Sequence, residues 1–420
     1  MEYISQNKSK EYDVVVIGGG ASGMMAAAVA AESGKSVLLL EKNKSLGEKL
    51  KITGGGRCNI TNAEFTVRTF LTHYGKASDF LFSPFSQFSA KDTFTYFESR
   101  GLPLDIQARN RVFPKTEKAS DVYSTLYNEL KKHKVTIETN CSVKRILHTN
   151  EVISGVRTTK GLLTAKSYIL ATGGVSHPET GSTGDGFDWL TELGHTVKEP
   201  TPTIVPLAVD DIWVKSLPGV SLSFMKITFY NDNKKTFSKT GKVLFTHFGL
   251  SGPLILNASS AVSGLIESGG KVTATIDAYP DTESGALEEK IIKLFDANKN
   301  KILRTVFKEI VPEGTAPGIA LLLPEIDFET KVHSITKDER KRIVGLLKAL
   351  PVSITGLMGY DRAVVADGGI SLEEIDTRTM RSKKFANLYV TGDLLHINRP
   401  SGGYSLQLCW TTGYVAGKSC

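Results

Sequence analysis

A glycine-rich stretch near the start of the sequence has the spacing of a phosphate-binding turn. Gly18, Gly20 and Gly23 satisfy the pattern Gly-x-Gly-x-x-Gly. In this pattern the first glycine permits a tight turn, the second lets the backbone approach a pyrophosphate, and the third lets a helix pack closely on a strand. The β-branched stretch 12–17 predicts a buried strand before the turn, and the alanine-rich stretch 24–33 predicts a helix after it. The first N–H groups of such a helix are suited to phosphate oxygens.

An acidic residue stands where the ribose of a dinucleotide would need one. A second apolar strand is expected at 36–40 and closes on Glu41, which is 18 residues after Gly23. A carboxylate about 20 residues beyond the glycines accepts hydrogen bonds from ribose hydroxyls. A lone glycine pattern is common, but strand, glycines, helix, strand and acid in this order predict a Rossmann-type dinucleotide-binding fold.

A second glycine run is followed by a cation. Three glycines at 54–56 leave bare backbone amides, and Arg57 and Cys58 come next. Such a loop can wrap an anionic dinucleotide, and the alternative is a flexible surface turn. Two more buried strands are expected to run into turns of small residues, at 171–174 and at 392–393.

The elements that position these residues need more than one core, because 420 residues suggest two or three domains. Hydrophobic residues make up 40% and charged residues 23%, as in a globular chain. The net charge of +7 favours anionic ligands. The basic residues are spread along the chain, which favours a solvated basic surface over a nucleic-acid groove. We therefore expect a small-molecule substrate and no nucleic-acid partner.

The cysteines and the apolar stretches narrow the class further. The four cysteines form no Cys-x-x-Cys pair, so neither a zinc cluster nor a disulfide framework is visible, and no metal site is expected. No stretch approaches the roughly 18 unbroken apolar residues of a membrane span, and the start of the chain lacks the apolar run of a secretory signal. We expect a cytoplasmic protein that does not bind membranes.

The expected secondary structure changes along the chain, from a mixed α/β pattern to short strands and then to helices, in a way that predicts an insertion. Residues 1–198 are expected to form the first part of the dinucleotide-binding domain, and residues 199–283 the first part of a β-rich domain. Residues 284–350 are expected to be a small helical domain, with helices at 287–295, 301–310 and 337–350. Residues 351–420 are expected to return through the β-rich edge to the dinucleotide-binding domain.

Taken together, these motifs, with THFGLSGP at 246–253 and SGGYSLQ at 401–407, resemble one family. It is the three-domain bacterial flavoprotein family that includes L-aminoacetone oxidase and the YhiN- and BaiN-type proteins, and the resemblance covers essentially the whole chain. It implies an α/β fold with a discontinuous Rossmann-type FAD-binding domain, an inserted β-barrel-like domain and a small helical domain. It also implies that FAD is held non-covalently, which we favour over a covalent link at Cys58. Carried over residue by residue, it implies FAD contacts at Gly18, Gly20, Ala21, Ser22, Gly23, Glu41, Lys42, Lys49, Gly55, Gly56, Arg57, Cys58, Ala171, Thr172, Gly173, Gly392, Asp393, Gly403, Tyr404, Ser405 and Leu406.

Each end of the cofactor then has a partner. Glu41 is expected to hold the adenosine ribose, the first helix the pyrophosphate, and Asp393 a ribityl hydroxyl or the edge of the pyrophosphate. A helix starting near Gly402 is expected to direct its N-terminal amides at the N1/C2 carbonyl edge of the flavin, where negative charge develops on reduction.

Three residues are candidates for catalysis. The chain has His396 where members of the family often have an acid, and Arg399 lies nearby. His396 is either a base or anion-binding group, since imidazole titrates near neutral pH, or a hydrogen-bonded loop histidine. His247 either acts on substrate or caps the turn before Gly249. Tyr404 either stacks on the flavin or donates to substrate, or it packs in the core.

These expectations combine into an FAD-dependent oxidoreductase that oxidises a small amine-type substrate by hydride transfer to FAD, with reoxidation by oxygen or another acceptor. Residues 200–350 contain no second Gly-x-Gly-x-x-Gly, so the separate NAD(P)H domain of disulfide-reductase-like flavoproteins is missing. One alternative is a reductase of an enone or steroid-like substrate, fed by NAD(P)H that docks transiently. Another is an FAD-containing RNA-binding or RNA-modifying protein. That alternative needs a basic face with stacking aromatics, which the sequence does not display.

Overall fold

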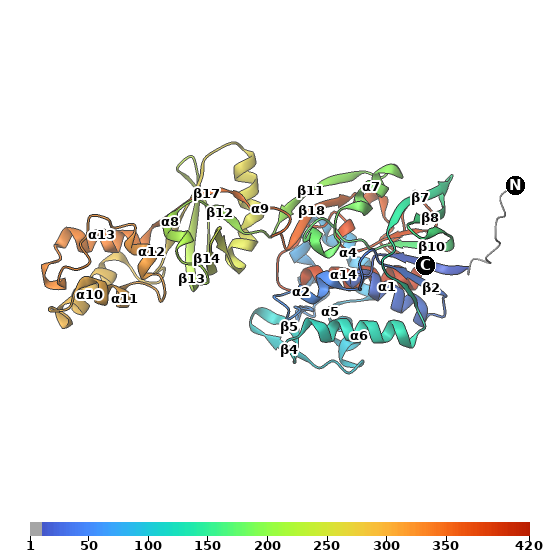
Figure 1. Cartoon of the computed structure of the whole chain (residues 1–420), viewed down its shortest axis with the longest axis horizontal. Coiled ribbons are helices and arrows are strands. Elements are labelled where there is room, and N and C mark those ends of the chain that lie inside the picture. The colour runs from blue at the N-terminus through green and yellow to red at the C-terminus, as the bar shows by residue number, and fades with distance from the viewer. Residues whose placement is uncertain (1–10) are drawn as a thin grey trace. The chain divides into compact units, whose positions relative to one another are not determined.

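The computed structural model describes residues 11–420, which fall into two compact units. The first unit contains the described residues up to 201 and those from 364 onwards, and the second contains residues 202–363. Figure 1 shows both units, coloured along the chain. The first unit is therefore discontinuous in sequence, because the second is inserted into it.

A parallel sheet forms the centre of the first unit. Its strand order is β19-β10-β1-β2-β6. In β1, residues 14–16 are fully buried, as expected of a β-branched run covered on both faces. The strands are β1 (Tyr12–Ile17), β2 (Val37–Leu40), β6 (Thr136–Glu138), β10 (Ala165–Leu170) and β19 (Leu388–Val390).

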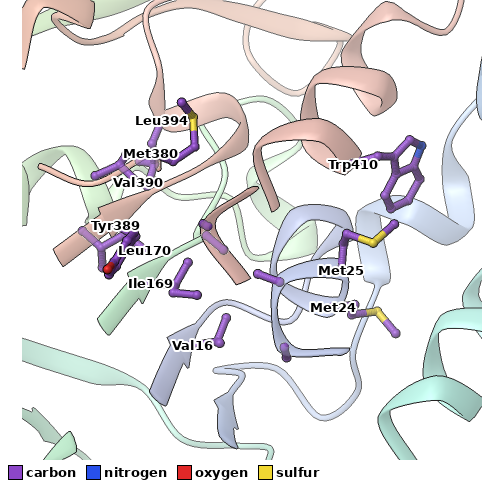
Figure 2. Close-up of a cluster of buried hydrophobic side chains, with 14 of the residues drawn as sticks. Val16, Met24, Met25, Ile169, Leu170, Met380, Tyr389, Val390, Leu394 and Trp410 are labelled. Carbon is purple, nitrogen blue, oxygen red and sulfur yellow. The ribbon is translucent and has the colours of Figure 1, made fainter. Parts of the chain in front are cut away.

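Two helices from opposite parts of the chain pack against each other in this unit. A Cβ atom added at Gly413 of α14 (Tyr404–Ser419) would lie 2.5 Å from the carbonyl oxygen of Ser22 in α1 (Ala21–Glu32), and one at Gly417 would lie 2.4 Å from that of Ala26. Only glycine allows backbones this close. Figure 2 shows the adjoining core, which takes side chains from strands and from both helices: Val16, Ile169, Leu170, Met24, Met25 and Trp410.

Smaller elements surround this sheet. Strands β3-β5-β4 and β7-β8-β9 form two antiparallel sheets, and β11 pairs with β18. The helices are α2 (Glu48–Ile52), α3 (Val67–Leu71), α4 (Ser78–Gln87), α5 (Ala90–Glu98), α6 (Ala119–Lys132) and α7 (Asp185–Glu192). The strands are β3 (Thr61–Asn62), β4 (Leu104–Gln107), β5 (Arg111–Pro114), β7 (Val143–Thr149), β8 (Val152–Thr158), β9 (Gly161–Leu163), β11 (Val197–Thr203) and β18 (Val365–Ile370).

The second unit is a closed barrel with strand order β12-β15-β14-β13-β16-β17. Helices α10 to α13 are inserted between the last two strands of the barrel in sequence. The strands are β12 (Leu207–Val209), β13 (Ser221–Asn231), β14 (Lys234–Thr246), β15 (Gly249–Ser251), β16 (Val272–Asp277) and β17 (Leu350–Leu357). The helices are α8 (Ile212–Lys215), α9 (Pro253–Glu267), α10 (Ser284–Ala297), α11 (Leu303–Ile310), α12 (Ala316–Ala320) and α13 (Lys337–Lys348).

The predicted fold class is confirmed: a Rossmann-type domain with a parallel sheet, a barrel and helices make up a mixed α/β protein. Within residues 11–420, none of the helices has the length and apolar character needed to cross a membrane.

Candidate functional site

The glycine turn after β1 has the geometry that a dinucleotide needs. Gly18 has φ of 107° and would place a Cβ atom 2.5 Å from the carbonyl oxygen of Ala171, while a Cβ at Gly23 would lie 1.8 Å from the carbonyl oxygen of Gly18. These two glycines are therefore required by packing. A Cβ at Gly20 would meet no atom within 4 Å, and Gly20 is the N-cap of α1. Open space at the start of this helix fits a pyrophosphate that receives the helix N–H groups.

Glu41 is fixed beside this turn at the end of β2. One carboxylate oxygen accepts a hydrogen bond from the backbone N–H of Gly19 at 2.9 Å, and the other accepts one from the backbone N–H of Asn43 at 2.8 Å. The side chain is buried. Because each carboxylate oxygen can accept more than one hydrogen bond, Glu41 has acceptor capacity left for ribose hydroxyls.

Two predicted cofactor contacts, Lys42 and Lys49, are engaged by a loop that the sequence analysis did not single out. Lys42 pairs with Asp185 at 2.9 Å and also donates to Thr183. The Lys49 ammonium donates to the hydroxyl of Ser176 at 3.1 Å. Burial lowers the pKa of Lys49. The segment 176–185, which ends at the first residue of α7, therefore lies beside these two lysines, and its glycine- and hydroxyl-rich sequence was the available signal.

The glycine run at 54–56 is left-handed throughout, with φ of 63°, 70° and 84°. A Cβ at Gly55 or Gly56 would meet no atom within 4 Å, so this loop has room for a ligand. Arg57, however, is directed elsewhere. Its guanidinium donates to Gln107 at 2.7 Å, pairs with Glu117 and lies 4.3 Å from the ring centre of Phe113. In this conformation Arg57 anchors the loop to β4 and β5.

Cys58 is a fully buried thiol with φ of 60°. Burial raises its pKa far above the ordinary value. Because the thiolate is the nucleophilic form of cysteine, this residue is poorly suited to a covalent flavin link. Each of the four cysteines of the chain is a free thiol in the structure.

Asp393 lies in a charged cluster after β19, in the short turn η6 (Gly392–Leu394). Its carboxylate pairs with Arg399 and lies 4.0 Å from the ammonium of Lys49. The Arg399 side chain is 1% exposed and also donates to the carbonyl of Ile397 at 2.6 Å and to the hydroxyl of Ser405 at 3.2 Å. Arg399 is thus a neutralised structural partner of Asp393, rather than a separate charge for substrate.

Helix α14 begins at a close backbone contact. A Cβ at Gly403 would lie 2.3 Å from the carbonyl carbon of Thr61, and Gly403 has φ of 102°. The first N–H groups of an α-helix lack partners within the helix. The start of α14 can therefore receive an anionic or carbonyl edge of a ligand, and it contains the predicted contacts Tyr404, Ser405 and Leu406.

The side chain of Tyr404 belongs to the core. It is 6% exposed, and its ring centre lies 4.9 Å from that of Phe70 and 4.5 Å from that of His73. Burial raises the pKa of its phenol. Among stacking on the flavin, donation to substrate and core packing, the geometry favours core packing. The backbone of Tyr404, at the start of α14, remains available to a ligand.

His396 lies in a polar cluster built by β11, β18 and the segment after η6. Its Nε2 atom is 3.5 Å from a carboxylate oxygen of Asp367 and 3.4 Å from the ammonium of Lys198. Burial lowers the pKa of His396, Asp367 raises it and Lys198 lowers it. The side chain is 34% exposed. Asp367 and Lys198 were not foreseen, because they are distant from His396 in sequence.

His247 belongs to the second unit, between β14 and β15. It is exposed, and its ring centre lies 4.9 Å from that of Phe248. The three catalytic candidates thus have different surroundings: His396 a polar cluster, Tyr404 the core of the first unit, and His247 the surface of the second. The other predicted contacts lie just after strands of the first unit or at the start of its helices: Ala21, Ser22, Ala171, Thr172, Gly173 and Gly392.

Curated proteins similar to this chain cover nearly its full length. A 3-dehydro-bile acid delta(4,6)-reductase of Clostridium scindens is 28% identical over 393 residues, which is 93% of each chain. Two proteins named ribosomal RNA dihydrouridine synthase also match. The one from Haemophilus influenzae is 27% identical and covers 96% of this chain and 97% of its own; the one from Escherichia coli is 25% identical and covers 97% of both.

Solved structures share the fold at lower identity. A flavocytochrome c3 fumarate reductase in an open conformation matches with a TM-score of 0.55 and 18% identity, covering 99% of this chain and 79% of its own. A 3-ketosteroid delta1-dehydrogenase from Sterolibacterium denitrificans matches with a TM-score of 0.52 and 15% identity, covering 97% and 99%.

The family model described as the HI0933-like protein Rossmann domain matches residues 12–419. This match confirms the family resemblance drawn from the motifs, and it agrees with the expectation of an FAD-dependent oxidoreductase. By the extent of this match, the chain belongs to the HI0933-like family of Rossmann-domain proteins.

Proposed function

We propose that this protein is an FAD-dependent reductase that saturates a carbon–carbon double bond conjugated to a carbonyl group, with NAD(P)H as a transient electron donor. Two kinds of relatives support this choice. One is named a delta(4,6)-reductase of a 3-dehydro bile acid, and the other a dihydrouridine synthase. Both names describe the addition of two hydrogens across a ring double bond.

The observation that carries the proposal is the cluster of His396, Asp367 and Lys198. Saturation of a conjugated double bond needs a hydride at one carbon and a proton at the other. His396 is three residues beyond Asp393 in the turn that we assign to the cofactor. Its imidazole can carry a proton: burial and Lys198 lower the pKa of His396, which makes the proton easier to give up, while Asp367 opposes this shift. Oxidation of an amine has no need of such an acid.

The other residues bind and orient. FAD, when bound, supplies the hydride-transfer chemistry, so no protein nucleophile is needed. Glu41 would hold a ribose of FAD, the start of α1 would receive the pyrophosphate, and the start of α14 would stabilise negative charge on the ring edge. The electrons balance, because NAD(P)H gives up one hydride to become NAD(P)+, and the substrate gains one hydride and one proton.

The free cysteines are consistent with this assignment. All four thiols are unpaired, and Cys58 is fully buried. The four thiols therefore offer no disulfide relay, and FAD, when bound, would supply the redox chemistry. Oxidation of a small amine, with oxygen as acceptor, is the competing outcome for the same FAD site.

An anaerobic titration tests the proposal. The purified flavoprotein is mixed with NADH, NADPH or aminoacetone, and the flavin absorbance at about 450 nm is followed. We expect bleaching by NADH or NADPH, and then recovery when a 3-oxo-Δ4,6 steroid or a uridine-containing RNA is added. Bleaching by aminoacetone alone, with peroxide on re-aeration, would replace the reductase by an amine oxidase.

A further inference from the structure

The barrel of the second unit carries a strained and exposed aromatic residue. Phe224 in β13 has φ of 59° and is 71% exposed. The pairing of β13 with β14 shifts register between Leu222 and Met225, so Phe224 lies in a β-bulge. Bulges redirect a side chain and interrupt strand pairing. Phe224 is therefore presented outside the regular alternation of the barrel.

The backbone conformation of Phe224 lowers the stability of the fold, and packing of its exposed ring does not offset this cost. A positive φ is rare for a bulky residue, and such backbone strain is of order 1–3 kcal/mol. An exposed phenyl ring also leaves apolar surface in water. Glycine would occupy the same position without strain. The presence of phenylalanine here points to a use for the ring itself.

Two lysines lie beside the bulge on the strand pair. Lys226 pairs in register with Thr240, and Lys242 is next to Gly241 and Val243, which pair with Met225 and Leu222 on either side of the bulge. Their neighbours Ile227 and Val243 are fully buried. Because side chains alternate along a strand, Lys226 and Lys242 face outward. Both are exposed, and within the described residues neither makes an ion pair.

The charge of the second unit is concentrated on this strand pair. Residues 221–246 contain five lysines and one acid, Asp232, whereas the rest of the unit contains 15 basic and 17 acidic residues. The carboxylate of Asp277, which pairs in register with Lys226 on the other side, is held by Lys348 at 2.7 Å. Of the five lysines, Lys226 and Lys242 lie beside the bulge, whereas Lys234 and Lys235 pair at the far end of the hairpin and Lys239 donates to the carbonyl of Asn257. We define Phe224, Lys226 and Lys242 as the bulge patch.

We propose that the bulge patch binds RNA, with a base stacked on Phe224 and phosphates held by Lys226 and Lys242. An exposed flat ring with cations at neighbouring positions of the strand pair matches an unpaired base and its anionic backbone. A membrane would require a larger apolar face. The proposal rests on the proposed function in one respect, since it makes RNA the carrier of the conjugated double bond, the C5=C6 bond of uracil.

The test measures binding by the full-length, FAD-loaded protein without NAD(P)H. The probe is a fluorescein-labelled, uridine-rich single-stranded RNA followed by anisotropy over a salt series. We expect the double variant K226E/K242E to bind at least about tenfold more weakly and to lower the salt slope by about 1.4, the contribution of two phosphates. The matched control is K290E/K293E, which makes the same charge change at two exposed lysines of α10.

The ring is tested separately. Phe224→Ala should weaken binding about tenfold, whereas Ile212→Ala, at a position 76% exposed, should not. Phe224→Gly should weaken binding and also raise the melting temperature, because it removes the strain.

Three results would overturn the bulge patch: no RNA binding by the wild-type protein, equal losses in the K290E/K293E control, or binding to phosphatidylserine vesicles without binding to RNA. Reduction of a small 3-oxo-Δ4,6 steroid by NAD(P)H should be unchanged in K226E/K242E. If the wild type reduces the steroid but binds no RNA, the patch fails and the proposed function stands. If the wild type binds RNA but neither NADH nor NADPH bleaches the flavin, the bulge patch stands and the proposed function fails.

Discussion

The glycine turn of the first unit and the bulge patch of the second both depend on left-handed backbone, but they use it differently. At Gly18 a positive φ is combined with a close backbone approach, which removes any choice of side chain. At Phe224 the same region is occupied by a large, exposed side chain. The first arrangement is explained by packing alone. The second is explained only if the side chain has something to contact, so the residue type at a strained position separates structural from binding roles.

The charges of the two regions differ as well. In the first unit the site cations have partners: Lys42 pairs with Asp185, Arg399 with Asp393 and Arg57 with Glu117. In the bulge patch, Lys226 and Lys242 face solvent. Paired charges fix a shape, whereas solvent-facing charges attract a polyanion from a distance.

Gly23→Ala should have the largest effect, because it tests whether packing alone explains the glycine turn. The new Cβ would lie 1.8 Å from the carbonyl oxygen of Gly18, so α1 would have to move away from β1. We expect a loss of about 3 kcal/mol or more in the free energy of unfolding and little bound flavin, measured by denaturant unfolding and flavin absorbance. Gly264→Ala in α9 is the matched control, since its Cβ meets no atom within 4 Å. It should be neutral or slightly stabilising.

Gly20→Ala should have the next largest effect, and only on the cofactor. The space around Gly20 is empty of protein atoms and its φ is −81°, so the apoprotein should unfold at the same denaturant concentration. The Cβ would occupy the space that we assign to the pyrophosphate. We expect the dissociation constant for FAD to rise about tenfold or more, measured by fluorescence titration. Unchanged affinity would mean that the cofactor does not approach this residue.

His396→Ala should leave FAD bound and lower kcat about tenfold to a hundredfold, as expected for loss of a proton carrier. If His396 donates the proton, the rate should fall as pH rises through the pKa of His396, which burial places below its ordinary value. Asp367 raises that pKa, so Asp367→Asn should move this limb of the pH profile to lower pH. Lys198→Ala should move it to higher pH. A profile that neither change moves would assign His396 to the structure of the loop.

The smallest effect is expected from a buried histidine in the first unit. Ser382 accepts hydrogen bonds from the backbone N–H groups of Lys384 and Phe385, so its hydroxyl donates to Nε2 of His195 at 3.1 Å. The other ring nitrogen then donates to Glu374 at 2.6 Å. His195 is thus held in its neutral form.

Burial lowers the pKa of His195, Glu374 raises it and Lys384 lowers it. The unfolded chain takes up a proton below about pH 6.5, whereas the folded chain resists it. The stabilisation is therefore complete above that pH and declines as the pH falls below it. The melting temperature should drop between about pH 7.5 and about pH 5.5, and this drop should be smaller in His195→Gln. Equal slopes in the two proteins would assign the acid sensitivity to other groups.

The sequence predicted the elements whose signals are local. The run at 12–17 became β1, Glu41 ended β2, and the helix expected at 301–310 became α11 (Leu303–Ile310). The directions of the side chains depended on residues that are distant in sequence. Arg57 follows three glycines, as a phosphate ligand would, yet it is drawn to Gln107, Glu117 and Phe113, which come from a distant part of the chain. Tyr404 likewise is the first residue of α14, yet its side chain enters the core.

The surface depended on pairing that the sequence does not display. Lys226 and Lys242 are separated by a full hairpin in sequence, so they read as scattered charges. The register of β13 and β14 places Lys226 opposite Thr240, two residues from Lys242, beside a bulge that only the pairing reveals. The partners of His396 came from β11 and β18 in the same manner.

The contact between α1 and α14 has a consequence for the order in which the protein matures. Gly413 and Gly417 lie against the backbone of α1, and β19 completes the sheet that begins with β1. The glycine turn after β1 is translated early, but the helix and strand that hold it in place are translated after the entire barrel and its helical insertion. A ribosome-bound chain would present the turn unsupported, so we expect cofactor loading to follow release of the chain, and the barrel to fold while its host domain is still open.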